Sequence, residues 1–224
     1  MRRIIKGQEP EALLRWREIE VPENLIYANM PKAEVKRQML AEQGYLCAYT
    51  MQRIETPDDC HIEHIVPRNQ PNQPRHMDVD YNNLLACVPS NTPGHRPLVN
   101  NLPYGAPKKG GTHVDGANFV SPLRVDVESR FQYSVDGSVA HLPDDVSARS
   151  TVEILRLDHE QLKDLRRAAI DERVFPAEVT LSVQEAEHLS RAALTPDLAG
   201  RLPEFCLAIS QVAHWYAARM QETI

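Results

Sequence analysis

The 224-residue sequence contains no long apolar run. No stretch approaches the roughly 18 apolar residues that a membrane-spanning helix needs, and the first residues lack the apolar core of a signal peptide. These absences predict a cytoplasmic protein without a membrane partner. Hydrophobic residues nevertheless make up 42% of the chain, so it has enough apolar surface to form a core and is not a disordered protein.

Cysteine is scarce in the sequence. In a chain without an export signal, free thiols or metal ligands are more common than a disulfide framework, and we expect no disulfide bond. One cysteine falls on the apolar face of a predicted helix and is expected in the core. The four cysteines are Cys47, Cys60, Cys87 and Cys206.

An excess of positive charge is also absent, since the formal net charge is −6. Residues 61–124 carry 6 basic and 4 acidic side chains, whereas residues 125–224 carry 10 and 17. Proteins that bind a long stretch of nucleic acid usually have a strongly basic surface, because neutralised phosphates supply much of the affinity. If this chain acts on nucleic acid, it needs a small contact area in the middle segment or a partner that does the binding.

Helical signals dominate the N-terminal region, and one hairpin signal follows the middle segment. Apolar residues at helical spacing predict helices after Pro10 and Pro31, the second ending at Gly44 in a left-handed conformation. Between them and the hairpin, the chain is dense in Pro, Asn and Gly and is expected to be mostly loop with short strands. Asp136-Gly137 is the strongest turn signal of a β-hairpin.

The C-terminal half is predicted to be helical. Asp158 with Gln161, and Ser182 with Glu185, have the spacing of capping boxes that begin two helices. A final helix has one apolar face formed by Phe205, Ile209, Val212, Tyr216 and Met220. We divide the chain into N-terminal helices (1–44), a central core (45–125), a hairpin with helices that completes it (126–175) and a C-terminal helical lobe (176–224).

The stretch CHIEHIVPRN crowds His61, Glu63 and His64 together. In a strand, side chains alternate, so His61 and Glu63 share one face and His64 points to the other. A carboxylate can bind a divalent ion, and a nearby neutral imidazole can deprotonate a water that the ion orients. The pattern therefore predicts hydrolysis of phosphodiesters, with further ligands offered by Asn82, Asn83 and Asn91.

The segments GYLCAYT, HIEHIVPR and YNNLLACVPSN together resemble the HNH endonuclease motif, in which two strands and a helix clamp one divalent ion. The resemblance implies an α+β protein whose ββα-metal core is embedded in a mainly helical chain, with Mg²⁺ or Mn²⁺ as cofactor. By position, Glu63 matches the acidic metal ligand and His64 the general base. Asn83 matches the residue that braces the loop carrying the base, and Asn91 the last ligand. His95 ranks behind Asn91, because a Pro-Gly pair between them argues against a regular helix.

Further segments, including YGAPKKGG and FVSPLRVDVESRFQYSVDGSV, are similar in the same order to PtuB-type HNH proteins of Septu and some retron anti-phage systems. The similarity covers roughly residues 1–173. It implies a hetero-oligomer with a PtuA-type ATPase that degrades nucleic acid during infection. DNA is the leading substrate, and RNA, including transfer RNA, stays open. An obligate partner would supply the missing basic surface.

The sequence departs from this family at its structural zinc site. Many relatives hold a zinc with two Cys-x-x-Cys pairs, but here Thr50 and Ser90 replace the second cysteine of each pair. A hydroxyl is a poor zinc ligand beside a thiolate. The structural zinc is therefore expected to be absent, and an irregular site stays open, composed of Cys47, Cys60, His61 and Cys87.

Arg68, Lys108 and Lys109 lie in the locally positive middle segment. We expect them to contact substrate phosphates, the alternative being solvated surface charges. The lost cysteines and the negative net charge also suggest a second function, an inactive HNH fold that serves as a binding module for the ATPase. The retained carboxylate and imidazole favour the enzyme. In both cases the N-terminal helices and residues 176–224 are expected to dock on the ATPase.

Overall fold

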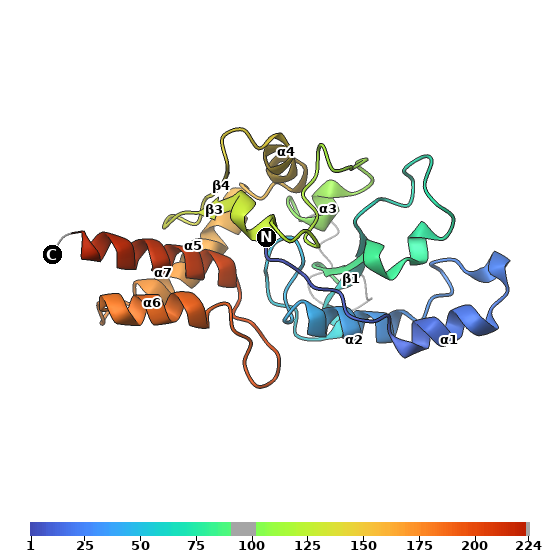
Figure 1. Ribbon diagram of the computed structural model, residues 1–224, viewed down its shortest axis with the longest axis horizontal. Helices are drawn as coiled ribbons and strands as arrows, with labels where there is room; N and C mark the ends of the chain where they lie inside the picture. Colours follow the sequence, from blue (N-terminus) through green and yellow to red (C-terminus); the bar gives the residue numbers. More distant parts are fainter. Residues whose placement is uncertain (91–101, 223–224) are drawn as a thin grey trace.

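The computed structural model describes residues 1–90 and 102–222. Within these ranges the chain forms seven α-helices and two two-stranded antiparallel sheets, so the protein is α+β. Figure 1 shows the first sheet with α1 and α2 at one end of the molecule, α5 to α7 at the other, and α3 and α4 between them. The predicted ligands Asn91 and His95, and any helix completing a ββα motif at 91–101, lie outside the described residues.

The two N-terminal helices form where their apolar spacing predicts them, as α1 (Glu11–Ile19) and α2 (Lys32–Glu42). The predicted left-handed glycine after α2 is confirmed, since Gly44 has φ of 62°. A side chain there would also be obstructed, because an added Cβ would lie only 2.4 Å from a methyl carbon of Leu202. Gly44 is therefore required both by its conformation and by a neighbour from far along the chain.

The first sheet pairs β1 (His61–His64) with β2 (Leu84–Cys87). In their antiparallel register, His61 lies opposite Cys87 and His64 opposite Leu84. The buried Gln43 side chain continues the sheet beyond β2, donating to the Ala86 carbonyl at 2.8 Å and accepting from the Ala86 N–H at 2.9 Å. The sheet thus rests on the end of α2, and β2 is buried along its whole length.

The second sheet is the predicted hairpin, β3 (Phe131–Tyr133) and β4 (Val139–His141), and it is preceded in sequence by the short helix α3 (Ala106–Lys109). Gly137 at its turn has φ of 79°, which confirms the turn signal. An added Cβ there would lie 2.2 Å from the Lys163 carbonyl oxygen. Short 3₁₀ helices connect the elements at Pro22–Asn24, Pro57–Asp59, Met77–Val79, Tyr81–Asn83 and Val127–Arg130.

Two of the predicted helix starts have different outcomes. The capping box of Ser182 and Glu185 is confirmed at the start of α6. The other predicted helix forms as α5 at residues 160–174, but its predicted capping box at Asp158 is wrong, because the N-cap is His159, whose ring accepts from the Gln161 N–H at 3.3 Å. The four C-terminal helices are α4 (Val146–Leu155), α5 (Glu160–Val174), α6 (Val183–Ala192) and α7 (Cys206–Gln221).

The last helix belongs to the same core as the N-terminal half. The Leu202 N–H donates to the Gly44 carbonyl, and the Phe205 N–H to the Met51 carbonyl, both at 3.1 Å. Of the predicted apolar face, Tyr216 and Met220 are only half-buried, and the rest is buried. All four cysteines are buried and free, including Cys206 in the core as predicted. The described part of the predicted C-terminal lobe, residues 176–222, therefore contributes to the core of the protein.

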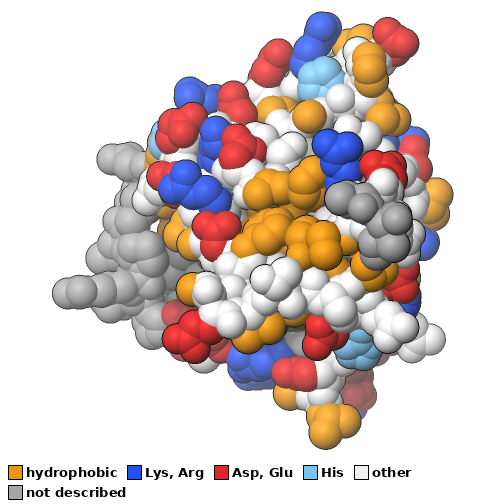
Figure 2. Space-filling model, turned by 90° about the vertical axis from the view of Figure 1, so that its left-hand side faces the viewer, with side chains coloured by type: hydrophobic (Ala, Val, Ile, Leu, Met, Phe, Trp, Pro, Cys, Tyr) orange, Lys and Arg blue, Asp and Glu red, His pale blue; other side chains and the backbone are white. Residues whose placement is uncertain are grey.

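The surface of the helical end carries apolar groups. Figure 2 faces this end and shows hydrophobic side chains gathered near its centre with charged side chains around them. Among the exposed large apolar residues of α5 to α7 and their connections are Leu165, Val179 and Trp215. Over the described ranges, no helix combines the length and apolar character that crossing a membrane requires.

Candidate active site

An open cleft of about 580 Å³ lies over the first sheet. Its lining includes the clustered residues of β1 and Arg68 from the loop that follows β1. Two glycines that follow α3 and Tyr27, which precedes α2, complete it. The structure thus brings together most of the described residues that the sequence singles out. The cleft is lined by Tyr27, His61, Ile62, Glu63, His64, Pro67, Arg68, Asn69, Gly110 and Gly111.

His61 and Glu63 share one face of β1, with His61 Nε2 and Glu63 Oε2 3.9 Å apart. The other ring nitrogen of His61 donates to the Pro89 carbonyl at 2.6 Å, so in the neutral ring Nε2 carries the lone pair. Burial lowers the pKa of His61, but the Glu63 carboxylate and the Pro89 carbonyl outweigh it and raise the pKa above its ordinary value. This is the arrangement of a ligand pair whose histidine is oriented by a backbone carbonyl.

The second oxygen of Glu63 is bound by Lys109. Lys109 Nζ donates to Glu63 Oε1 and to the His64 carbonyl, each at 2.8 Å, and its side chain has no exposed surface. The expected contact between Lys109 and substrate phosphate does not match this position, because the ammonium group lies inside the protein. Lys108, its neighbour on α3, points outward and is exposed, so only one of the two lysines is available at the surface.

His64 lies beside the ligand pair and is largely buried. Its Nε2–H donates to the Asp78 carbonyl at 2.9 Å, which leaves Nδ1 as the basic nitrogen. Burial lowers the pKa of His64, and the nearby Arg68 lowers it further, against the opposing effect of the Asp78 carbonyl. A neutral imidazole with one nitrogen fixed as donor can accept a proton through the other.

Asn83 braces the loop that follows β1. Its Oδ1 accepts from the Val66 N–H at 2.8 Å, and its Nδ2 donates to the carbonyls of Val66 and Met77 at 3.1 and 3.0 Å. Both N–H donors and the oxygen of this buried amide thus form hydrogen bonds with backbone groups. This is the position that the resemblance assigns to Asn83, and it leaves the residue a structural part of the site.

Tyr27 is a cleft residue that the sequence did not reveal. Its ring packs edge-on against His64 with centroids 4.9 Å apart, and the Arg68 guanidinium carbon lies 4.8 Å from its centroid. The Tyr27 N–H donates to Asp78 Oδ2 at 3.0 Å, which fixes the loop before α2 to the cleft. Arg68 itself is exposed, so its cation is available at the rim.

Two atoms of the described residues could bind a divalent ion as ligands, His61 Nε2 and Glu63 Oε2. A mixed nitrogen and oxygen set suits Mn²⁺ and related ions, and Mg²⁺ commonly completes its shell with water and substrate oxygens. In the part of the chain that the structure describes, no group of three or more His, Cys, Asp or Glu residues is placed to hold a metal ion. Asn91 and His95, the further ligands that the sequence suggests, lie outside the described residues.

The residues of the irregular zinc site do not form a group of that kind. The Cys60 thiol donates to the Pro57 carbonyl at 3.4 Å, and burial raises its pKa to about 12. Burial raises the pKa of Cys47 as well, but hydrogen bonds with Cys87 and Thr50 outweigh it and lower the pKa to about 6. Ser90 donates its hydroxyl to the Asp58 carbonyl. The segments 47–50 and 87–90, which replace the two Cys-x-x-Cys pairs, are thus held by hydrogen bonds within the protein.

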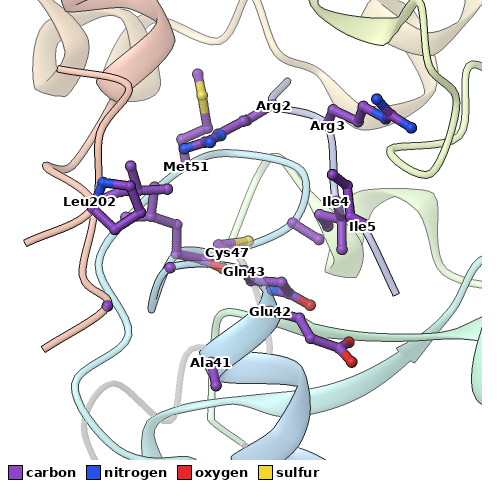
Figure 3. A pocket seen from close by; sticks show the side chains of 15 residues that line it. Arg2, Arg3, Ile4, Ile5, Ala41, Glu42, Gln43, Cys47, Met51 and Leu202 are labelled. Carbon is purple, nitrogen blue, oxygen red and sulfur yellow. Dashed lines mark hydrogen bonds between the residues drawn. The ribbon is translucent and has the colours of Figure 1, made fainter. Parts of the chain in front are cut away.

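A smaller cavity of about 130 Å³ lies where the N-terminal segment meets the end of α2 and the loop before α7. Figure 3 shows Arg2, Arg3 and Met51 along its upper side, with Leu202 on the left and Cys47 below them. None of the predicted catalytic residues lines this cavity.

No protein-family model matches this chain, and no curated protein matches it significantly. The function is therefore inferred from the cleft, where His61, Glu63, His64 and Arg68 meet.

Proposed function

We propose that this protein is a metal-dependent HNH-type endonuclease that hydrolyses phosphodiester bonds of nucleic acid. One observation carries the proposal: the candidate ligand pair and a neutral imidazole lie side by side on one strand. His61 Nε2 and Glu63 Oε2 are 3.9 Å apart, and the adjacent His64 has its Nε2–H committed to the Asp78 carbonyl. An ion site and a base in one cleft are the two parts that metal-assisted phosphodiester hydrolysis requires.

Each residue has a role in the proposed reaction. When bound, the ion would supply positive charge that stabilises the phosphoryl oxygens and orients a water molecule. His64 accepts a proton from water at Nδ1, since Nε2 is occupied as a donor. Arg68, exposed at the rim, attracts a phosphate into the cleft, and Asn83 keeps the loop after His64 in place.

The biological setting is proposed from the resemblance of the sequence to PtuB-type proteins. We propose a subunit of a bacterial anti-phage complex in which a PtuA-type ATPase is the partner. Two features are consistent with dependence on a partner, the net charge of −6 and the apolar groups on the helical end. DNA is the favoured substrate and RNA the second, because an ion site of this kind contacts a phosphodiester and not a base.

The first test is cleavage of a mixed DNA and RNA panel in Mg²⁺ or Mn²⁺ by the protein co-expressed with the ATPase. His64→Ala should abolish cleavage while the protein stays folded, and Glu63→Gln should do the same. His113→Ala is the matched control, because this histidine is exposed and outside the cleft. Full cleavage by the His64→Ala protein would refute the mechanism.

A second function, an inactive module that binds the ATPase, is favoured by one observation. Lys109 already occupies one oxygen of Glu63. In an inactive module this ion pair would simply stabilise the fold, and no divalent ion or partner would produce cleavage of any substrate in the panel. The same experiment therefore separates the two functions.

A further inference from the structure

Lys109 is a buried cation in contact with the candidate ion ligand. Its Nζ lies 2.8 Å from Glu63 Oε1 and 2.8 Å from the His64 carbonyl oxygen, and its side chain has no exposed surface. A buried lysine is stable in charged form only when it is paired and hydrogen-bonded, and both conditions are met here. Any ion bound through Glu63 Oε2 would share this carboxylate with Lys109.

The position of Lys109 is fixed by the fold. The Gly105 N–H, just before α3, donates to the Leu155 carbonyl of α4 at 2.6 Å. Gly105 and Gly110 flank α3 with φ of 72° and 49°, conformations that other residues rarely adopt. An added Cβ at Gly105 would also lie 3.1 Å from a Thr50 methyl carbon. The short helix is therefore held between α4 and the central core, with Lys109 directed at β1.

The formal charges of the described residues at the cleft give no negative excess. Glu63 and Asp78 are negative, whereas Lys109, Arg68 and Lys32, which lies over the Tyr27 ring, are positive. The affinity of a protein site for a hard divalent cation increases with the negative charge of its ligands. A carboxylate that is already neutralised by an ammonium group should therefore bind such an ion weakly on its own. A nucleic-acid phosphate would bring both a negative charge and an oxygen ligand.

We propose that Lys109 is a positioning residue that keeps the ion affinity of the free protein low, so that the divalent ion is retained only with nucleic acid in the cleft. This inference rests on the proposed function. Lys109 holds Glu63 through Oε1 and leaves Oε2 facing His61, and its charge opposes binding of the ion. Nucleic acid supplies the charge that completes the site.

The test is binding of Mn²⁺ alone to the full chain, measured by electron paramagnetic resonance of free Mn²⁺. Lys109→Met, which keeps much of the side-chain volume, should raise the affinity by about tenfold or more. Lys109→Arg keeps the charge and should bind Mn²⁺ as weakly as the wild type. In the His64→Ala background, which prevents cleavage, a short DNA oligonucleotide should tighten binding of Mn²⁺ when Lys109 is present.

Three results would count against the inference. If Lys109→Met binds Mn²⁺ no more tightly than Lys109→Arg does, the inference is overturned. Mn²⁺ binding that DNA does not tighten would also overturn it. If Lys109→Met is poorly folded without metal, Mn²⁺ should raise its melting temperature more than that of Lys109→Arg, and an equal or smaller rise would again overturn it. Binding that Glu63→Gln does not weaken would instead overturn the proposed function.

Discussion

Asn83 binds both polar backbone groups of Val66, accepting from its N–H at 2.8 Å and donating to its carbonyl at 3.1 Å. Asn83→Ala removes these partners and leaves the Val66 and Met77 groups unsatisfied. We expect a loss of about 1–3 kcal/mol in unfolding free energy and, if the protein is a nuclease, a roughly 100-fold loss of cleavage. Denaturant unfolding and cleavage assays measure the two effects.

The control for Asn83 is its exposed neighbour, so Asn82→Ala should change neither quantity. Equal effects of the two substitutions would show that the bracing contacts of Asn83 do not matter.

The turn of the hairpin formed by β3 and β4 should tolerate no side chain. Gly137→Ala places a Cβ about 2.2 Å from the Lys163 carbonyl oxygen at a φ of 79°. We expect a loss of about 3 kcal/mol, from the left-handed conformation together with the clash. Gly200→Ala measures the cost of the left-handed conformation alone, because Gly200 has φ of 76° but no atom lies within 4 Å of an added Cβ. This substitution should cost only about 1 kcal/mol of unfolding free energy. Thermal unfolding measures both losses of stability. Equal losses for Gly137→Ala and Gly200→Ala would mean that the turn moves enough to relieve the clash.

Asp145 should make stability depend on acid pH. Burial raises its pKa, but hydrogen bonds from Arg130 and the Ala148 N–H outweigh it and lower the pKa below the ordinary value of 3.8. A lowered pKa means that the stabilisation is present above pH 3.8 and is lost as pH falls through the lower folded value. Asp145→Asn should cost about 1–2 kcal/mol at pH 7, because it removes the charged hydrogen bonds from Arg130, whereas Asn can still accept from the Ala148 N–H at the N-cap of α4.

The difference between wild type and Asp145→Asn should shrink as the pH falls below the ordinary value of 3.8. Urea unfolding across the acid range measures it, with the exposed Asp144→Asn as control. A difference that stays constant with pH would exclude the charged interaction with Arg130.

Helix α7 should be required for the stability of the whole protein. Ile209→Ala empties a fully buried position and should cost about 2–5 kcal/mol, whereas Leu198→Ala, at a fully exposed site, should cost nothing measurable. Deleting residues 176–224 should accordingly unfold the chain and not leave the central core (45–125) intact. A well-folded deletion variant with intact near-UV circular dichroism would contradict this.

Local patterns predicted the elements that depend on neighbours in sequence. Apolar spacing after Pro10 gave α1, and strand alternation correctly placed His61 and Glu63 on one face. The cap of α5 was predicted one residue early, at Asp158 and not at His159, because both residues offer a side-chain acceptor at the start of the helix.

Contacts between distant segments could not be predicted in this way. Lys108 and Lys109 are adjacent on a helix of one turn, where periodicity cannot tell which is buried. Packing of α3 against α4 decides it. Tyr27 reaches the cleft through an interaction with Asp78, which lies 51 residues away, and no local signal marks it.

The attachment of the segment before α7 to the central core has a consequence for protein synthesis. The Arg53 N–H donates to Glu204 Oε1, 151 residues further along the chain, beside the backbone contacts that join Leu202 and Phe205 to the core. At roughly 5–20 residues per second, a ribosome needs on the order of 10–30 seconds to make that intervening chain. The core beneath the cleft therefore stays incomplete until residues 202–205 have been synthesised, so the framework that holds His61, Glu63 and His64 cannot be completed by residues 1–175 alone.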